Sequence, residues 1–247
     1  MSEILVIGDT CKDIYVYGSC DRLCPDFPVP SFIPSHEKQN LGMAGNVYQN
    51  ILSLGSRATL KTNSAVIEKK RYVDKKTNHM FLRVDSGEEK VQRVEGLSKH
   101  FLSKFKLIII SDYNKGFLLK EDIKFICDNH SQVFIDTKKT LGDFCKDCSF
   151  IKINQAEYTN SLDFINKNPS INKKIIQTLA GEGCKLEDQH FCVEKVEIKD
   201  SCGAGDTFLA ALCFKYLDCS EISDSIVFAN ECATQVVQQR GVNVIKK

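Results

Sequence analysis

The sequence predicts an α/β protein whose doubly wound, mainly parallel sheet is flanked by helices and accompanied by a small second β-sheet. Two observations lead to this prediction. Short, continuous apolar runs alternate with stretches of helical period, and the apolar runs end in polar residues. Early in the chain, segments that contain prolines and alternate apolar with polar residues interrupt that arrangement.

The main sheet is expected where apolar runs are continuous, because parallel strands covered on both faces carry few polar residues. In chain order these runs are Glu3–Asp9, Lys106–Asp112, Gln132–Thr137, Ser149–Asn154 and Lys174–Leu179. Helical patterns lie between and after them, at Gly45–Leu54, Val94–Phe105, Lys120–Asn129, Gly205–Leu217 and Ser220–Gln238. This alternation indicates right-handed crossovers between the parallel strands.

The second sheet is expected from four segments. They are Asp13–Gly18, Phe27–Pro34, Arg71–Lys76 and Met80–Asp85. The first two alternate apolar and polar residues, with prolines, which is typical of edge strands because proline cannot donate a ladder hydrogen bond. The last two are further strand candidates. We expect these strands to project from the main sheet.

Composition limits the classes of function. The chain has 247 residues, 43% of them hydrophobic, and its 33 basic and 32 acidic residues give a net charge of +1. This balance does not favour a nucleic-acid partner, and the apolar runs are too short to span a membrane. The N-terminus lacks the basic start and cleavage site of a signal peptide, so a cytoplasmic protein is expected. In that compartment the twelve cysteines would be reduced.

Polar residues follow several of the predicted strands. They are Asp9, Asp112, Asp136 and Asn154. Ligands of open α/β sheets bind beyond the carboxyl ends of the strands, so these residues favour a polar ligand there. The alternative is that they cap turns.

The stretch Asp200–Asp206, DSCGAGD, carries the clearest chemistry. Gly203, Ala204 and Gly205 stand directly before a predicted helix, whose first N–H groups and positive dipole end suit a phosphate. Asp206 in the first turn could accept a proton from an attacking hydroxyl. The residues alone predict a phosphate-binding α/β protein; the alternative is an ordinary turn. The sequence contains neither a GxxxxGK[ST] motif nor GxGxxG after the first strand.

The same stretch resembles the DTxGAGD signature of the ribokinase-type (PfkB) carbohydrate kinases. Leu41–Gly55 is similar to that family's sugar-binding signature, Asn154–Glu157 to its NxxE motif, and Thr178–Gly183 to its nucleotide-site turn. The D-glycero-D-manno-heptose 7-phosphate kinases are the most similar branch. The segments that carry this likeness are Arg22–Pro30, Phe81–Asp85, Ser111–Gly116 and Ile135–Lys139.

The resemblance implies a single ribokinase-like kinase domain over residues 1–247, with lid strands drawn from about 13–34 and 70–86. It implies ATP and Mg²⁺ as cofactors and phosphorylation of O1 of D-glycero-D-manno-heptose 7-phosphate to the 1,7-bisphosphate, for nucleotide-activated heptose synthesis. A homodimer through the lid would follow. Two alternatives stay open: a PfkB-type kinase for another sugar, sugar phosphate or nucleoside, and a non-catalytic relative that binds sugar phosphate or nucleotide.

The resemblance also implies roles for particular residues. Asp206 would be the base, in an anion hole made by Gly203, Ala204 and Gly205. Asp13 and Asn46 would bind the sugar hydroxyls, and Gly42 would let the sugar approach the backbone. The 7-phosphate would be bound by Arg83, Lys115 and Lys138. The nucleotide phosphates would lie beside Thr178, Gly181 and Gly183, and the adenine near Asn230. Mg²⁺ would be held through waters by Asn154 and Glu157, for which a helix-capping box is the alternative.

The chain departs from the family pattern at several points. Met43 stands where the family usually has glycine, and Cys202 replaces the usual threonine, so oxidants are predicted to inhibit there. The chain is also short after Ala65 and between Asn154 and Thr178.

Overall fold

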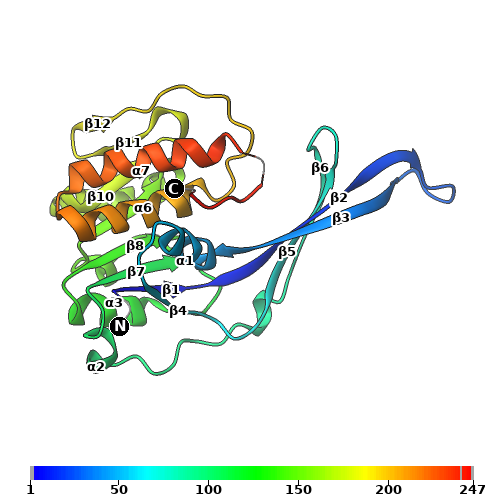
Figure 1. Cartoon of the computed structure of the whole chain (residues 1–247). Helices are drawn as coiled ribbons and strands as arrows, with labels where there is room; N and C mark the ends of the chain where they lie inside the picture. The colour runs from blue at the N-terminus through cyan, green and yellow to red at the C-terminus, as the bar shows by residue number, and fades with distance from the viewer. Residues whose placement is uncertain (1–2, 240, 246–247) are drawn as a thin grey trace.

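The computed structural model describes residues 3–239 and 241–245. Within these residues, eight strands form the main sheet in the order β12-β11-β10-β9-β8-β7-β1-β4 (Figure 1). Their bounds are β1 Ile4–Gly8, β4 Ala58–Lys61, β7 Leu107–Asp112, β8 Val133–Thr137, β9 Phe150–Asn154, β10 Ile175–Thr178, β11 Cys184–Leu186 and β12 Gln189–Phe191. Neighbours from β4 to β10 are parallel, whereas β11 and β12 add antiparallel strands at one edge.

Helices cover both faces of this sheet, as the sequence predicts. One face packs against α1 (Ala44–Ser53), α6 (Ala204–Cys219) and α7 (Ile222–Val237). The other packs against α2 (Lys99–Leu102), α3 (Lys120–Asn129), α4 (Gln155–Asn160) and α5 (Leu162–Lys167). Ile4 and Val6 of β1 belong to the first core, and Leu5 and Ile7 to the second. A strand buried on both sides explains its unbroken apolar run.

The predicted helix Val94–Phe105 is mostly wrong, because only α2 forms in that stretch. Gly96 adopts a left-handed φ of 71°, and the Ser98 side chain then caps α2 by accepting the N–H of Phe101 at 3.1 Å. The sequence also missed strands β4, β11 and β12, which are only three or four residues long.

In the described part of the chain, four further strands form the second sheet, in the order β3-β2-β5-β6. They are β2 (Thr10–Leu23), β3 (Pro30–Met43), β5 (Ile67–Asp74) and β6 (Met80–Ser86). The edge position predicted from the prolines is correct for β3 and wrong for β2. The latter contains no proline, so it can pair with β3 on one side and with β5 on the other.

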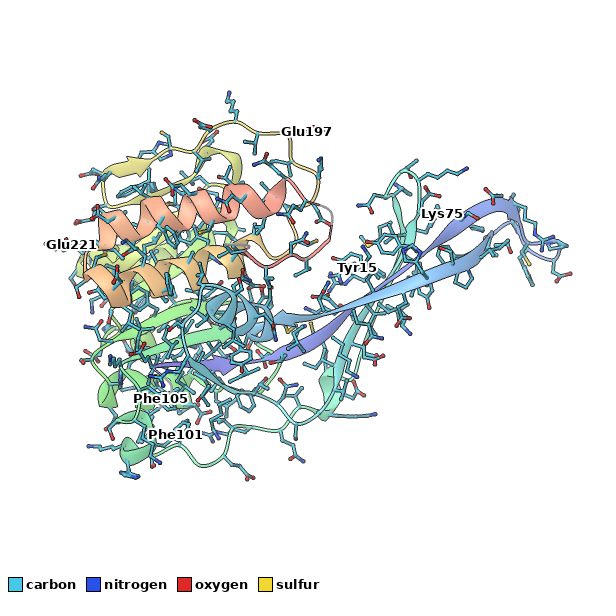
Figure 2. The ribbon with its side chains drawn as sticks, in the orientation of Figure 1. Tyr15, Lys75, Phe101, Phe105, Glu197 and Glu221 are labelled. Atoms are coloured by element: carbon cyan, nitrogen blue, oxygen red, sulfur yellow. The ribbon has the colours of Figure 1, made fainter. Side chains whose placement is uncertain are left out.

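The β2–β3 hairpin projects from the body as a long arm (Figure 1). Tyr15 of β2 lies nearer the body than Lys75, which follows β5 (Figure 2). Large apolar side chains on the second sheet are 38–70% exposed: Leu23, Phe27, Val29, Ile33, Met80, Phe81, Leu82 and Val84. The arm therefore carries an uncovered apolar surface away from the main core.

No helix within residues 3–239 and 241–245 combines the length and the apolar character that crossing a bilayer requires.

Candidate active site

The stretch Asp200–Asp206 folds as a glycine turn at the start of α6. Gly203 precedes the helix with a φ of 82°, and a Cβ there would lie 2.7 Å from Nδ2 of Asn46. Both the backbone conformation and the lack of space therefore require glycine. The Asp200 carboxylate fastens the turn by accepting the N–H groups of Cys202 at 2.9 Å and Gly241 at 3.1 Å.

Asp206 lies in the first turn of α6 and is only 5% exposed. Its Oδ1 accepts the Tyr113 hydroxyl at 2.7 Å, and its Oδ2 accepts Nδ2 of Asn46 at 3.1 Å. Burial raises the pKa of Asp206 to about 6, although both hydrogen bonds act in the opposite direction. The carboxylate is therefore ionised at neutral pH yet basic enough to take a proton.

Asn46 of α1 contacts the candidate base. Its Oδ1 accepts Nδ2 of Asn50 at 3.1 Å, which turns its own Nδ2 toward Asp206. The sequence prediction assigned Asn46 to the sugar hydroxyls; the structure gives it a further contact that orients the carboxylate.

Gly42 of β3 lies opposite Cys11 of β2, and the carboxylate of Asp13, two residues further along β2, reaches over it. The Asp13 carboxylate is ion-paired with Nη1 of Arg71 on β5. A Cβ on Gly42 would lie 2.1 Å from Oδ2 of Asp13 and 2.7 Å from Sγ of Cys11. Gly42 thus makes room for the Asp13 carboxylate itself, a role that the sequence did not reveal.

The Gly42→Ala substitution is expected to weaken sugar binding by about ten- to a hundredfold. The added methyl group displaces the Asp13 carboxylate and so removes the hydrogen bonds that Asp13 is expected to make to the sugar. Calorimetric titration with sugar and with ATP checks this, and the ATP affinity should stay unchanged. Gly142→Ala is the matched control, since a Cβ there meets only Phe144, at 3.4 Å. A folded Gly42→Ala protein with parental sugar affinity would exclude Asp13 from the sugar site.

A network of charged side chains lies beside the glycine turn. Lys152 of β9 donates to Oδ2 of Asp136 at 2.5 Å, and both residues are buried. A Cβ on Gly205 would lie only 2.9 Å from the Lys152 ammonium. Lys138 bonds to Glu157 and lies 4.0 Å from Oδ1 of Asp136. The sequence analysis missed Lys152, although a lysine inside the apolar run of β9 is itself unusual.

Asn154 and Glu157 form the capping box that the sequence offered as an alternative. Oδ1 of Asn154 accepts the N–H of Glu157 at 2.9 Å, and Oε2 of Glu157 accepts the N–H of Asn154 at 2.8 Å. Among residues 3–239 and 241–245, no cluster of three or more His, Cys, Asp or Glu side chains is arranged to ligate a metal directly. These residues therefore fit only a hydrated ion, reached through its waters.

A large pocket of about 1030 Å³ brings the glycine turn together with the candidate nucleotide residues. Its lining includes Thr178, Gly181, Gly183, Asn230, Asn154, Lys138 and Asp206. An apolar wall, absent from the sequence prediction, is made by Val193, Val196, Ile198, Ala233 and Val237. The amide of Asn230 donates to the carbonyl of Phe191 at 3.0 Å and so fixes this wall to β12.

Arg83 and Lys115 lie apart from this pocket and are absent from its described lining. Arg83 makes two bonds of 2.7 Å to Asp85 on the same strand. Lys115 pairs with Glu88 at 2.7 Å. Their contact with the 7-phosphate of the substrate stays a prediction, because this pocket holds the candidate nucleotide residues rather than the candidate sugar residues.

Two of the four polar strand ends hold the protein's own loops. Asp9 accepts backbone N–H groups from the loop after β7, including that of Tyr113 at 2.8 Å. Asp112 is buried in an ion pair with Lys139 at 2.7 Å. For these two residues the turn-capping alternative describes the structure, whereas Asp136 and Asn154 do line the pocket.

The comparison with known proteins decides the family. A family model described as pfkB family carbohydrate kinase matches residues 59–246. The chain belongs to the pfkB carbohydrate kinases. It is therefore a sugar kinase, a phosphotransferase that acts on sugar hydroxyl groups.

One curated relative and two solved structures of other proteins are similar to this pfkB kinase. It is 29% identical over 289 residues to the bifunctional protein HldE of Nitratiruptor sp., covering 97% of the chain but only 62% of the relative. The chain thus spans about three-fifths of that curated relative. Ribokinase of Thermotoga maritima matches with a TM-score of 0.73 at 15% identity, covering 98% and 95% of the two chains. Arabidopsis thaliana ribokinase, solved with ribose and ATP, matches with a TM-score of 0.70 at 12% identity, covering 98% and 94%.

Met43 shows why pfkB kinases usually place glycine at this site. It precedes α1 with φ 59° and ψ −134°, a backbone conformation that side chains rarely adopt. The side chain is buried against Cys11 and Ile67. This packing offsets the strain, so a pfkB kinase can keep methionine here.

Two properties of Cys202 act in opposite directions on its reactivity. Desolvation and the neighbouring Asp200 raise the pKa of the thiol, which lowers the fraction of thiolate that oxidants attack. The residue is exposed, however, so oxidants can reach it. Inhibition at Cys202 therefore stays a prediction.

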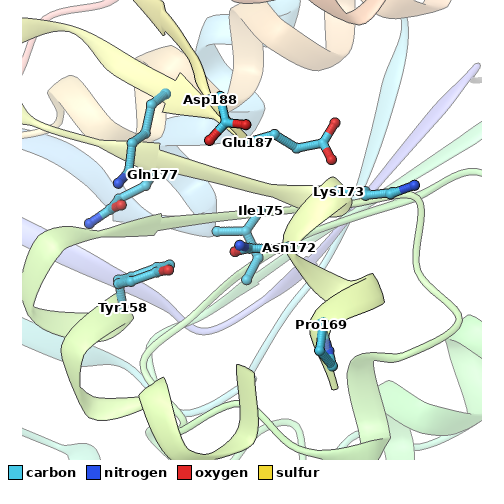
Figure 3. Close-up of a pocket in the computed structure, with 9 residues that line it drawn as sticks. Tyr158, Pro169, Asn172, Lys173, Ile175, Gln177, Glu187 and Asp188 are labelled. Carbon is cyan, nitrogen blue, oxygen red and sulfur yellow. The ribbon is translucent and has the colours of Figure 1, made fainter. Parts of the chain in front are cut away.

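A second, smaller pocket of about 280 Å³ is lined partly by the segment between Asn154 and Thr178, which the sequence suggested is shorter than in the family. Glu187 and Asp188, in the turn after β11, face Tyr158 and Pro169 across it (Figure 3). Its lining also includes Lys173 and Lys185, so acidic and basic groups balance.

Proposed function

We propose that this pfkB kinase transfers the γ-phosphoryl group of ATP to O1 of D-glycero-D-manno-heptose 7-phosphate, giving the 1,7-bisphosphate for nucleotide-activated heptose synthesis. The observation that carries the proposal is the cationic face of the second sheet beside the candidate base. The resemblance of Arg22–Pro30 and Ser111–Gly116 to heptose 7-phosphate kinases, and the relatives named HldE, support the choice of sugar.

The chemical step needs a proton acceptor and stabilisation of the transferring group. Asp206 accepts the proton of the attacking sugar hydroxyl. The N–H groups at the start of α6, around Gly203–Gly205, bind the oxygens of the phosphoryl group, and the Lys152 ammonium adds positive charge behind them. These groups are fixed by the fold before substrate arrives, which is what electrostatic stabilisation of a transition state requires.

The distal phosphate of the substrate needs cationic partners, and the strand register supplies them on one face. Asp13 lies opposite Lys69, and Arg71 opposite Arg83. Lys69 reaches the ring of Tyr113, which bonds to Asp206, so this face borders the base. We therefore assign the 7-phosphate to Arg71 and Lys69, joined by Arg83. Lys115 is left out of this assignment because it follows β7 of the main sheet and is not on this face of the second sheet.

ATP is assigned to the large pocket. Thr178, Gly181 and Gly183 are placed beside its phosphates, with Asn230 and the apolar wall around the adenine. Lys138, which the sequence assigned to the 7-phosphate, lines this pocket and is instead proposed to move from Glu157 to the nucleotide phosphates. Mg²⁺, when bound, neutralises phosphate charge. Its waters would be held by Asn154 and Glu157, and by Oδ1 of Asp136, which is buried and accepts no hydrogen bond from the described residues.

An ADP-release assay over a panel of acceptors tests the function. Heptose 7-phosphate should be turned over in the presence of Mg²⁺, and the unphosphorylated heptose at least about a hundredfold less efficiently, because the cationic face loses its partner. Chelation of Mg²⁺ should abolish turnover. A better rate with ribose, fructose 6-phosphate or a nucleoside would replace the substrate while keeping the kinase. Binding without turnover of any acceptor would favour the non-catalytic alternative.

The kinase is proposed to act in the cytoplasm as a dimer. Residues 1–247 would form a single kinase domain in the cytoplasm, where ATP is supplied. The second sheet would be its lid. The exposed apolar side chains of β6 and of the hairpin tip, such as Phe27 and Leu82, would be covered by the lid of a second copy.

A further inference from the structure

Tyr113 is held at both ends between the two sheets. Its hydroxyl donates to Oδ1 of Asp206 at 2.7 Å. Its backbone N–H donates to Oδ2 of Asp9 at 2.8 Å, and Asp9 is fully buried at the end of β1. The tyrosine is therefore fixed to the main sheet through its backbone and to the candidate base through its side chain.

Two lysine ammonium groups lie close to the ring of Tyr113. The ammonium of Lys69, on β5 of the second sheet, lies 5.3 Å from the ring centroid. The ammonium of Lys138, which follows β8 of the main sheet, also lies 5.3 Å from it. Cation–π contacts of this kind favour one orientation of the ring. The direction in which the hydroxyl points is thus set by residues of both sheets.

We propose that Tyr113 is a positioning residue that holds the Asp206 carboxylate in its proton-accepting orientation and sets the pH below which the kinase loses activity. The inference rests on the proposed role of Asp206 as the base. During transfer, the sugar oxygen bonds to phosphorus as the bond from phosphorus to the ADP oxygen breaks. The hydroxyl proton passes to Asp206, while Tyr113 keeps its own proton.

The protonation of both partners agrees with these roles. Burial and the nearby Asp206 raise the pKa of Tyr113 well above its usual value, so it stays a donor throughout the working pH range. A hydrogen bond donated to a carboxylate favours the ionised form, and the Tyr113 bond lowers the pKa of Asp206 against the effect of burial.

The other groups that face Asp206 come from several elements. Asp136 of β8 raises its pKa, while Lys152 of β9 lowers it. Lys138 and the Cys11 thiol of β2 also interact with it. Removing only the Tyr113 hydroxyl leaves all four groups in place, so a change in the pH dependence reports the lost hydrogen bond.

The variant Tyr113→Phe tests the proposal because it keeps the ring close to the lysines and removes only the donor. The acidic limb of the pH profile of kcat/KM should move up by about one pH unit, as expected for one hydrogen bond to a charged group. At pH 7, kcat should fall about tenfold, whereas the KM for ATP should change less than about twofold. Tyr158→Phe is the matched control. The ring centroid of Tyr158 also lies near a lysine ammonium, 5.6 Å from Nζ of Lys185, but Tyr158 lines the smaller pocket whereas Asp206 lines the large one. This variant should keep the parental profile.

A carboxyl NMR titration of Asp206 in both proteins provides a measurement that does not depend on turnover. An unchanged pKa of Asp206 in Tyr113→Phe would overturn the proposal. A lower melting temperature together with an unchanged acidic limb of the pH profile would also overturn the proposal, because Tyr113 would then contribute only to stability. If the parent turns over no sugar while the pKa of Asp206 still rises in the variant, the proposed function fails and the positioning by Tyr113 stands.

Discussion

Asp206→Asn is expected to lower kcat about a thousandfold or more while leaving the KM for ATP nearly unchanged. The amide cannot take the hydroxyl proton, and general base catalysis contributes up to about 10⁴-fold. The surrounding groups remain: the N–H groups at the start of α6 and the Lys152 ammonium still bind the phosphoryl group. Single-turnover measurements with saturating ATP separate this chemical step from binding.

The same substitution should not destabilise the fold, which makes it a clean test. The folded state raises the pKa of Asp206 from 3.8 to about 6, so the folded protein binds this proton more tightly than the unfolded chain does. The ionised carboxylate therefore costs about 3 kcal/mol of stability above pH 6, and this cost disappears as the pH falls toward 4. Denaturant titrations should find Asp206→Asn at least as stable as the parent at pH 8, with the difference shrinking at pH 4. Turnover that survives in this folded variant would contradict the assignment of Asp206 as the base.

Lys152→Met is expected to affect both stability and phosphoryl transfer. The substitution removes the closer cation from the buried Asp136 carboxylate and leaves only Lys138, 4.0 Å from Oδ1, so the cost should be at most about 3–5 kcal/mol. It also removes the ammonium beside Gly205, so kcat should fall about a hundredfold or more. Chemical denaturation and steady-state kinetics on the folded fraction check the two effects.

Two further variants separate these effects. The double variant Lys152→Met/Asp136→Asn should recover much of the stability, because no charge is left unpaired, but not the rate. Lys139→Met breaks another buried ion pair, with Asp112, outside the glycine turn. It should lose stability and keep its kcat. A folded Lys152→Met protein with the parental rate would show that the ammonium plays no part in transfer.

The sequence predicted the main sheet and the glycine turn well because both depend on local patterns. Strands buried on both faces need continuous apolar runs, and a helix start that binds an anion needs small residues around its first N–H groups. The predicted helix Val94–Phe105 failed because Gly96 takes a left-handed conformation, which the apolar period does not reveal.

The contacts within the candidate site could not be predicted because they join distant parts of the chain. Tyr113 and Asp206 are 93 residues apart, and Arg71 and Asp13 are 58 apart. The polar strand ends show the same limit. Asp9 and Asp136 looked alike in sequence, yet one holds a backbone loop and the other an ammonium inside the pocket. Only the spatial arrangement of partners distinguishes a structural carboxylate from one at the site.

The arm links the proposed dimer contact to the proposed sugar site through a single strand. Strand β2 runs from Asp13, in the proposed sugar site, to Leu23 near the exposed tip, a span of roughly 33 Å, and its pairing with β3 shifts register between Tyr17 and Gly18 and between Ser19 and Arg22. We expect a change at the tip to reach the sugar site along this strand. If it does, thermodynamic linkage requires that pairing of two tips and sugar binding change each other's affinity by the same factor. Measured sugar affinity should consequently vary with the concentration of the protein itself, and should stop varying when Phe27 and Leu82 are replaced by lysine.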